Sequence, residues 1–240
     1  MIDDLESYQG EMAEFAKTFI VPMKEASDRG EEFEPDGYDD FYKIFKGFTD
    51  ICETIETIEL LLVLVGLNPP RSKRISIDLY FKHIIASYIS EIYILKERLN
   101  SYATKISRMY SKADPSLDIK ADFDDLYSRI KDSLEGINNT RNLHVHSERY
   151  SDFDLNWLSS LRLVSEVDDS FELALNCKYK ELKAKWKKQV FDNNKAIAKL
   201  LTSYFDTIFR LISVDGKIVL PKRKDRSNEG ELVSEGLAAQ

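Results

Sequence analysis

The chain has 240 residues, of which 43% are apolar and 32% charged, a balance typical of a folded globular protein. Only 9 glycines and 6 prolines are present, too few for the many turns of an all-β protein. The net charge is −8, and residues 1–66 hold 17 of the 42 acidic residues but only 5 of the 34 basic ones. This acidic total argues against broad coating of nucleic acid, whereas the remaining chain, with a small basic excess, can still form a local RNA-binding surface.

The chain shows no membrane or secretory signal. Its longest apolar run, residues 58–67, is interrupted by Glu59 and falls far short of the ~20 residues that span a bilayer. The N-terminus is acidic and lacks a signal-peptide pattern. Cys52 and Cys177 stand alone, without metal-type spacing. We therefore expect a cytoplasmic protein without a membrane partner, with reduced cysteines.

Apolar residues recur at three-to-four spacing almost throughout, which predicts an all-α, up-and-down bundle of long helices. The predicted helices cover residues 2–24, 39–66, 75–111, 119–134, 154–165 and 170–214. The buried candidates of the first helix are Leu5, Met12, Phe15, Phe19 and Ile20, and the core stripe of the second is Ile51, Ile55, Ile58 and Leu62. The sequence predicts one bundle domain over residues 1–214, followed by a flexible, basic and polar tail over residues 215–240.

A six-residue segment, Arg-Asn-Leu-His-Val-His at positions 141–146, combines a permanent cation, an amide and titratable imidazoles. Arginine holds phosphate oxygens through two N–H donors, and histidine exchanges protons near neutral pH. RNA supplies its own nucleophile, the 2′-hydroxyl, so such a site needs neither a metal nor a cofactor. These residue types therefore predict phosphoryl chemistry on RNA.

Helical geometry separates the residues of this segment. Asn142 and His146 are four apart and share a helix face, whereas His144 and His146 are two apart and point to nearly opposite sides. Residues 136–140, Gly-Ile-Asn-Asn-Thr, predict a break with Thr140 as the cap of the next helix. A helix N-terminus at this place would add its own preference for phosphate.

Arg141, Asn142 and His146 resemble the Arg-polar-x3-His motif of the HEPN superfamily, whose members are helical bundles. The resemblance implies a metal-independent endoribonuclease in which His146 is the acid/base and Arg141 binds phosphate. It also implies a homodimer whose two motifs form one composite site. A toxin or defence role with an antitoxin partner follows from the same resemblance. Some toxin members follow the histidine with x-Tyr, but Glu148 stands at that position here.

Three alternatives to this interpretation stay open. One is an HEPN-like bundle that binds nucleotide, RNA or a protein without catalysis. The second is a plain helical interaction protein with a chance motif. In the third, His144 and His146 hold a metal, which needs a strand and a third ligand. The remaining histidine, His83, is expected to be a packing residue of the third helix.

A lysine-rich stretch at residues 178–188 surrounds two aromatic residues, Tyr179 and Trp186. Lysines beside aromatic rings suit the backbone and bases of RNA, which makes Lys183, Lys187 and Trp186 candidate RNA-binding residues. The alternative is a solvated helix face whose lysines balance the acidic N-terminal third. A second basic cluster, residues 222–226, lies in the predicted tail.

Overall fold

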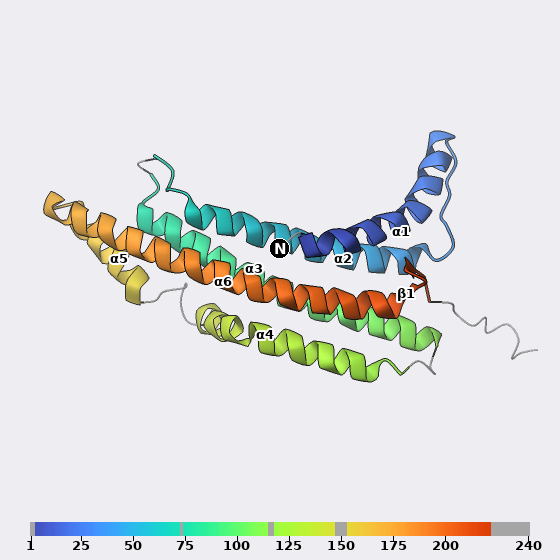
Figure 1. The fold of residues 1–240 in the computed structure, drawn as a ribbon. Coiled ribbons are helices and arrows are strands. Elements are labelled where there is room, and N and C mark those ends of the chain that lie inside the picture. The colour runs from blue at the N-terminus through green and yellow to red at the C-terminus, as the bar shows by residue number, and fades with distance from the viewer. Residues whose placement is uncertain (1–2, 73, 115–117, 147–152, 222–240) are drawn as a thin grey trace, which may run out of the picture.

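The computed structural model describes residues 3–72, 74–114, 118–146 and 153–221, and for residues 3, 4 and 136–146 it describes the backbone alone. Nearly all regular structure in this part of the chain is helical, so the fold is an all-α helical bundle, as predicted (Figure 1). The elements are α1 (Asp3–Asp28), α2 (Tyr38–Gly66), α3 (Ile77–Ala113), α4 (Lys120–His146), α5 (Phe153–Ser165), the short 3-10 helix η1 (Asp169–Phe171), α6 (Glu172–Ile212), β1 (Ser213–Val214) and β2 (Lys217–Ile218).

The core lies between α2, α3 and α6, which run alongside one another (Figure 1). The predicted core stripe of α2 is confirmed, since Ile51, Ile55 and Ile58 are buried and Leu62, partly buried, packs against the core. Two buried tyrosine hydroxyls join the helices by hydrogen bonds. The hydroxyl of Tyr88 in α3 donates to the Asn194 side chain in α6 over 3.0 Å. The hydroxyl of Tyr204 in α6 donates to the Leu99 carbonyl in α3 over 2.8 Å.

A glycine in the middle of α2 allows α2 and α3 to pack closely. A Cβ placed on Gly47 would lie 2.3 Å from Cδ2 of Tyr102, whose ring is fully buried. Real Cβ atoms do not approach other heavy atoms this closely. Glycine costs about 1 kcal/mol of helix propensity relative to alanine. The ring of Tyr102 occupies the space that this glycine leaves.

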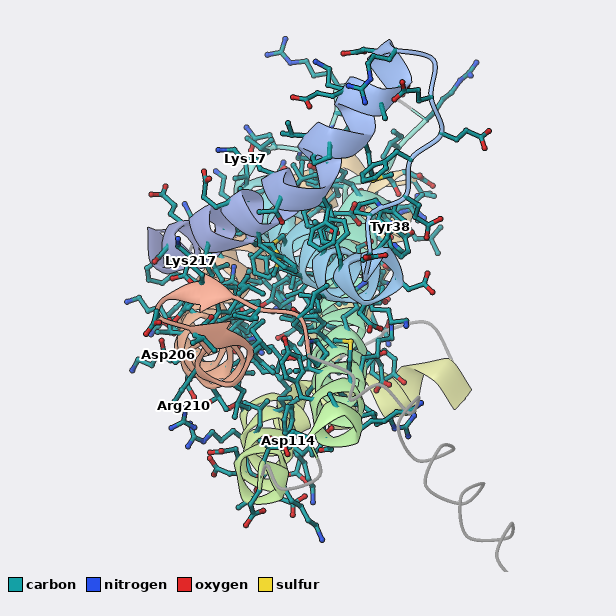
Figure 2. All side chains as sticks on the ribbon, turned by 90° about the vertical axis from the view of Figure 1, so that its right-hand side faces the viewer. Lys17, Tyr38, Asp114, Asp206, Arg210 and Lys217 are labelled. Atoms are coloured by element: carbon teal, nitrogen blue, oxygen red, sulfur yellow. The ribbon has the colours of Figure 1, made fainter. Side chains whose placement is uncertain are left out.

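Helix α1 crosses the bundle instead of joining it lengthwise. Figure 2, a view along the bundle, shows α1 running obliquely over α2 and α6. Its apolar face buries four of the five predicted core residues, Leu5, Met12, Phe15 and Phe19. Ile20 was expected in the core but is exposed. The predicted core of this helix is therefore wrong at that one position.

The chain returns to the bundle after α6. Strands β1 and β2 form an antiparallel hairpin around Asp215 and Gly216, both with positive φ, as a tight two-residue turn requires. The hydroxyl of Tyr110 in α3 donates to the Val219 carbonyl over 2.6 Å. Residues 215–221, predicted as the start of the tail, thus contact the bundle. Residues 222–240, with the second basic cluster, lie outside the described part of the chain.

Candidate functional site

Helix α4 carries the predicted catalytic residues and is anchored by a regular apolar stripe. Phe123, Leu126, Ile130 and Leu134 recur at spacings of three and four and are all buried. This stripe packs α4 against α3 and α6. The hydroxyls of Thr104 in α3 and Tyr127 in α4 add a hydrogen bond of 3.0 Å.

The predicted break before the motif is not formed. The backbone is helical from Lys120 through His146, so Thr140 lies inside α4 and does not cap a new helix. Gly and Asn weaken a helix by less than about 1 kcal/mol each, and residues 136–140 contain no proline to interrupt it. The phosphate preference expected from a helix N-terminus at the motif is therefore lost, because the N-terminus of α4 lies far away at Lys120.

Arg141, Asn142 and His146 all lie on the helical backbone at the end of α4. Asn142 and His146 are thus one helical turn apart, as the shared-face prediction requires. Their side chains, and that of His144, lie outside the described residues, so their roles remain predictions. The metal alternative needs residues 144–146 in a strand, but their backbone is helical. Among the side chains that are described, no group of three metal-ligating residues occurs.

Polar contacts of two residues, Asp154 and Arg162, fix α5, the next helix in the chain after α4. At its start Asp154 accepts from Lys178 over 2.9 Å and from Lys185 over 2.7 Å, both on α6. These lysines lower the pKa of the Asp154 carboxyl. Farther along α5, Arg162 pairs over 3.1 Å with buried Asp78 of α3. Helix α5 is thereby tied to both α3 and α6.

Opposing effects act on the pKa of the Asp78 carboxyl. Burial raises its pKa, but hydrogen bonds from Ser76 and Ser159, together with the charge of Arg162, outweigh burial and lower it below 3.8. The Ser159 hydroxyl donates to Asp78 over 2.7 Å. Asp78 is thus an ionised anchor for α5. Sequence patterning did not identify it, because ion pairs between distant helices leave no local signal.

His83, expected to be a packing residue, is exposed on α3. Its neighbours Ile84 and Ile85 are the residues of this turn that are buried in the core. His83 is therefore a surface histidine whose structural setting differs from the expectation. It provides a natural comparison for His146 in activity measurements.

The lysine-rich face of α6 differs from the aromatic ridge that the sequence suggested. Trp186 is only 5% exposed, so its indole ring is a core group and cannot stack on a base at the surface. Lys183 donates to Asn68 over 3.0 Å and lies above the ring of buried Tyr179. Lys187 is exposed. The described surface of this face is therefore cationic, but neither aromatic residue of the predicted ridge is available on it.

An open groove of about 600 Å³ lies beside this face, between the end of α2 and the middle of α6. Its lining comprises Leu62, Val63, Gly66, Ala184, Lys187, Lys188 and Phe191. Phe191 is exposed, and Lys195 Nζ lies 4.5 Å from the centre of its ring. Phe191 was not among the residues predicted from the sequence, but its exposed ring makes it an accessible aromatic group in this groove.

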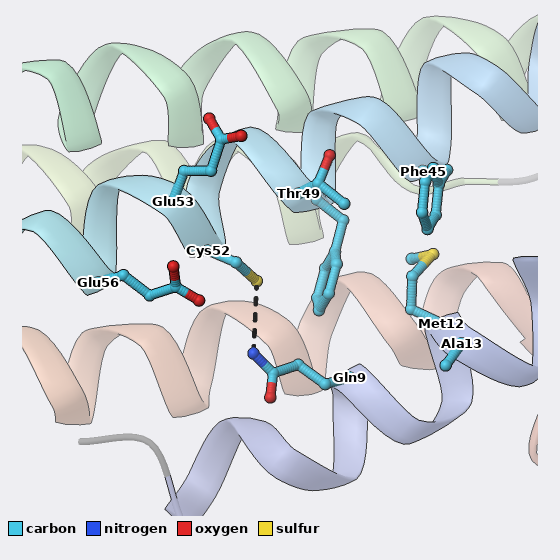
Figure 3. Close-up of a pocket in the computed structure, with 9 residues that line it drawn as sticks. Gln9, Met12, Ala13, Phe45, Thr49, Cys52, Glu53 and Glu56 are labelled. Atoms are coloured by element: carbon cyan, nitrogen blue, oxygen red, sulfur yellow. Dashed lines mark hydrogen bonds between the residues drawn. The ribbon is translucent and has the colours of Figure 1, made fainter.

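A second cavity, of about 270 Å³, lies between α1 and α2 (Figure 3). Gln9 of α1 points to the Cys52 thiol, with its amide nitrogen 3.8 Å from the sulfur. Burial raises the pKa of this thiol to about 11, so it stays protonated at neutral pH. A protonated thiol is a poor nucleophile. The arrangement therefore gives Cys52 no catalytic character.

Comparisons of the chain with protein-family models, curated proteins and solved structures find no match. In the described part of the chain, no helix is long and apolar enough to cross a membrane.

Proposed function

We propose that the protein is a metal-independent endoribonuclease of HEPN type. The observation that carries this proposal is the Arg141-Asn142-x3-His146 motif on the continuous helix α4 of an all-α bundle. The buried apolar stripe of α4 supports it, because this stripe packs the helix that carries the motif against α3 and α6. A site for proton transfer needs a backbone that holds its groups in place.

In the proposed reaction, the RNA 2′-hydroxyl attacks the adjacent phosphorus atom. One His146 takes the 2′ proton, and the His146 of a second copy gives a proton to the leaving 5′ oxygen. Arg141 stabilises the charge that develops on the phosphoryl oxygens. The P–O5′ bond breaks as the P–O2′ bond forms. The products are a 2′,3′-cyclic phosphate and a 5′-hydroxyl end, and no metal or cofactor enters the balance.

The charge arrangement is compatible with a polyanionic substrate. The 17 acidic residues of the first 66 positions lie on α1, α2 and the loop between them. Helices α3 and α6 separate these elements from α4 (Figure 1). The acidic third therefore lies on the far side of the bundle from α4. On α6, exposed Lys187 and half-buried Lys183 are the predicted contacts for the RNA backbone.

The test is cleavage of single-stranded RNA in EDTA by the wild type and by His146→Ala. The control is His83→Ala, which removes an exposed histidine on α3 and leaves the motif intact. We expect the wild type and the control to cut, and His146→Ala to lose at least about 100-fold, the usual contribution of an acid/base group. Equal cutting by His146→Ala would remove it from the mechanism.

The same experiment separates the alternatives. RNA binding without cutting would favour a non-catalytic HEPN-like bundle. Cutting that occurs without EDTA but is lost when EDTA is added would indicate a metal.

The proposed toxin or defence role has its own test. Expression of the wild type should arrest growth of a bacterial host, whereas His146→Ala should not, and a cognate antitoxin should relieve the arrest.

A further inference from the structure

The groove between α2 and α6 belongs to a longer surface on which these two helices lie side by side. The rings of Phe48 and Phe205 lie 5.3 Å apart toward one end of the pair, and Lys183 donates to Asn68 at the other, so the helices are antiparallel. Helix α1 lies over both helices toward the first end (Figure 2), where the ring of Tyr8 packs against Phe205. Farther along, the described lining of the groove comes from α2 and α6 alone. The chain thus covers one part of this helix pair with a helix of its own and leaves the next part open.

The lining of this groove combines small residues with accessible apolar side chains. Gly66 at the end of α2 and Ala184 on α6 take up little space, and a Cβ on Gly66 would meet nothing within 4 Å. Leu62 is half-buried, Val63 is 57% exposed and Phe191 is 49% exposed. The α6 part of the lining extends over about two helical turns, or ~11 Å. Two helical walls with an apolar lining form the kind of groove that receives the apolar face of another helix.

The α6 side of the groove is positively charged. Lys187 and Lys188 lie in its lining, and Lys195 Nζ lies 4.5 Å from the centre of the Phe191 ring. At 100° per residue, all three lysines lie within about 60° of Phe191 around the helix, whereas Asp192 lies about 100° away. None of the three lysines forms an ion pair with a described residue. Their charges are therefore available to an incoming anion.

Acidic residues near the groove are fewer than these lysines. Half-buried Glu59 precedes Val63 by about one turn on α2. Glu181 precedes Ala184 on α6, but it is paired with Lys178 over 3.0 Å. The described surroundings of the groove therefore keep an excess of positive charge, which attracts carboxylates.

RNA is the alternative anionic occupant, because Lys187 is one of its predicted contacts. Recognition of single-stranded bases relies on open aromatic faces and on hydrogen-bonding side chains. The one ring of the described lining, Phe191, already carries Lys195 over it, and this lining holds no amide or hydroxyl side chain. A second copy of this chain would set lysines against lysines in a two-fold contact. The lining therefore favours an acidic helix over both.

We propose that the groove between α2 and α6 binds an acidic amphipathic helix of a partner protein. Apolar side chains of this helix, spaced three or four residues apart, pack on Val63 and Phe191. Its Asp and Glu residues pair with Lys187 and Lys188 and select it over helices of other charge. The site is independent of the proposed function, because no residue of the Arg141–His146 segment lies in the described lining.

The experiment titrates the full chain into two labelled synthetic helices and follows their fluorescence anisotropy. Both peptides have about 18 residues, enough to be helical, with leucines spaced three or four apart. One peptide carries glutamates at the other positions, and its control carries lysines there. We expect the glutamate peptide to bind, and the lysine peptide to bind at least about tenfold more weakly.

Two groove variants locate the contact, each with a matched control elsewhere on the surface. Val63→Glu places a charge in the lining, and Leu163→Glu does so at a 59% exposed apolar residue of α5. Lys188→Glu reverses a charge of the lining, and Lys131→Glu reverses that of an exposed lysine on α4. We expect each groove variant to weaken binding of the glutamate peptide at least about tenfold, and both controls to bind as the wild type does.

Failure of the glutamate peptide to bind would overturn the proposal, as would equal binding of the two peptides or binding that survives both groove substitutions. Oligouridine is titrated in the same way, and light scattering on the same samples detects self-association. Oligouridine binding that both groove substitutions abolish, without binding of the glutamate peptide, would assign the groove to nucleic acid. A wild-type dimer that Val63→Glu dissociates would assign it to a second copy. Either result would overturn the proposal.

Discussion

Replacing Gly47 with alanine tests the packing of α2 against α3. Alanine gains about 1 kcal/mol of helix propensity. Its Cβ would lie 2.3 and 2.8 Å from two carbons of the Tyr102 ring, which is buried and has no room to move aside. Overpacking of this kind costs ~1–3 kcal/mol, and a buried ring that cannot move aside puts the cost near the upper end, at about 2–3 kcal/mol. We expect Gly47→Ala to lower the free energy of unfolding by about 1–2 kcal/mol in total.

Gly10→Ala is the matched control, because Gly10 is also inside a helix but a Cβ there meets nothing within 4 Å. It should gain stability, by up to about 1 kcal/mol. Urea unfolding followed by circular dichroism measures both variants, and thermal unfolding should shift by about 2–4 °C per kcal/mol. The double variant with Tyr102→Leu should show positive coupling, since the leucine frees space for the new methyl group.

Equal stabilisation by Gly47→Ala and Gly10→Ala would exclude the close contact between Gly47 and the Tyr102 ring. It would mean that Tyr102 does not occupy the space above Gly47 and that α2 and α3 pack in another register.

Three further outcomes are expected from the buried groups. Tyr102→Phe should be neutral or stabilising by about 1 kcal/mol, because the hydroxyl is buried without a hydrogen-bond partner among the described residues; a clear loss in urea unfolding would contradict this. The lowered pKa of Asp78 means that its ionised form stabilises the fold above pH 3.8 and that this contribution is lost as the pH falls through the folded-state value. The free energy of unfolding should therefore fall more steeply below pH 3.8 in the wild type than in Asp78→Asn, and parallel curves would count against the anchor. A disulfide reagent at pH 8 should modify exposed Cys177 quickly and Cys52 slowly until the protein unfolds, since burial raises the pKa of Cys52 to about 11; equal rates would show that the cavity at Cys52 is open.

Much of the fold could be predicted because α2 and α3 bury apolar residues at regular helical spacing. Their predicted bounds agree with the structure to within a few residues. The hairpin at Asp215-Gly216 was missed, although an Asp-Gly pair is a hairpin signal. The predicted break at residues 136–140 was wrong, because Gly and Asn only weaken a helix and no proline is present there to end it.

The candidate site was predictable only as a motif. Periodicity identifies which residues face a core, but it does not show how distant helices meet, so the anchors Asp78 and Arg162 were not foreseen. The prediction that Trp186 binds RNA was wrong, because its ring is buried. Lysines beside an aromatic residue give the same local sequence pattern whether the ring points outward or inward. Phe191 was overlooked because it lies outside the lysine-rich stretch at residues 178–188, so the local composition did not single it out.

Cleavage of RNA by the Arg141–His146 segment through the 2′-hydroxyl can be checked on the chemical ends of the products. Mass spectrometry of a short RNA cut in EDTA should show a 2′,3′-cyclic phosphate, and a substrate with 2′-deoxyribose at the cleaved position should stay intact. A linear 5′-phosphate end, or equal cutting of the deoxy substrate, would exclude attack by the 2′-hydroxyl.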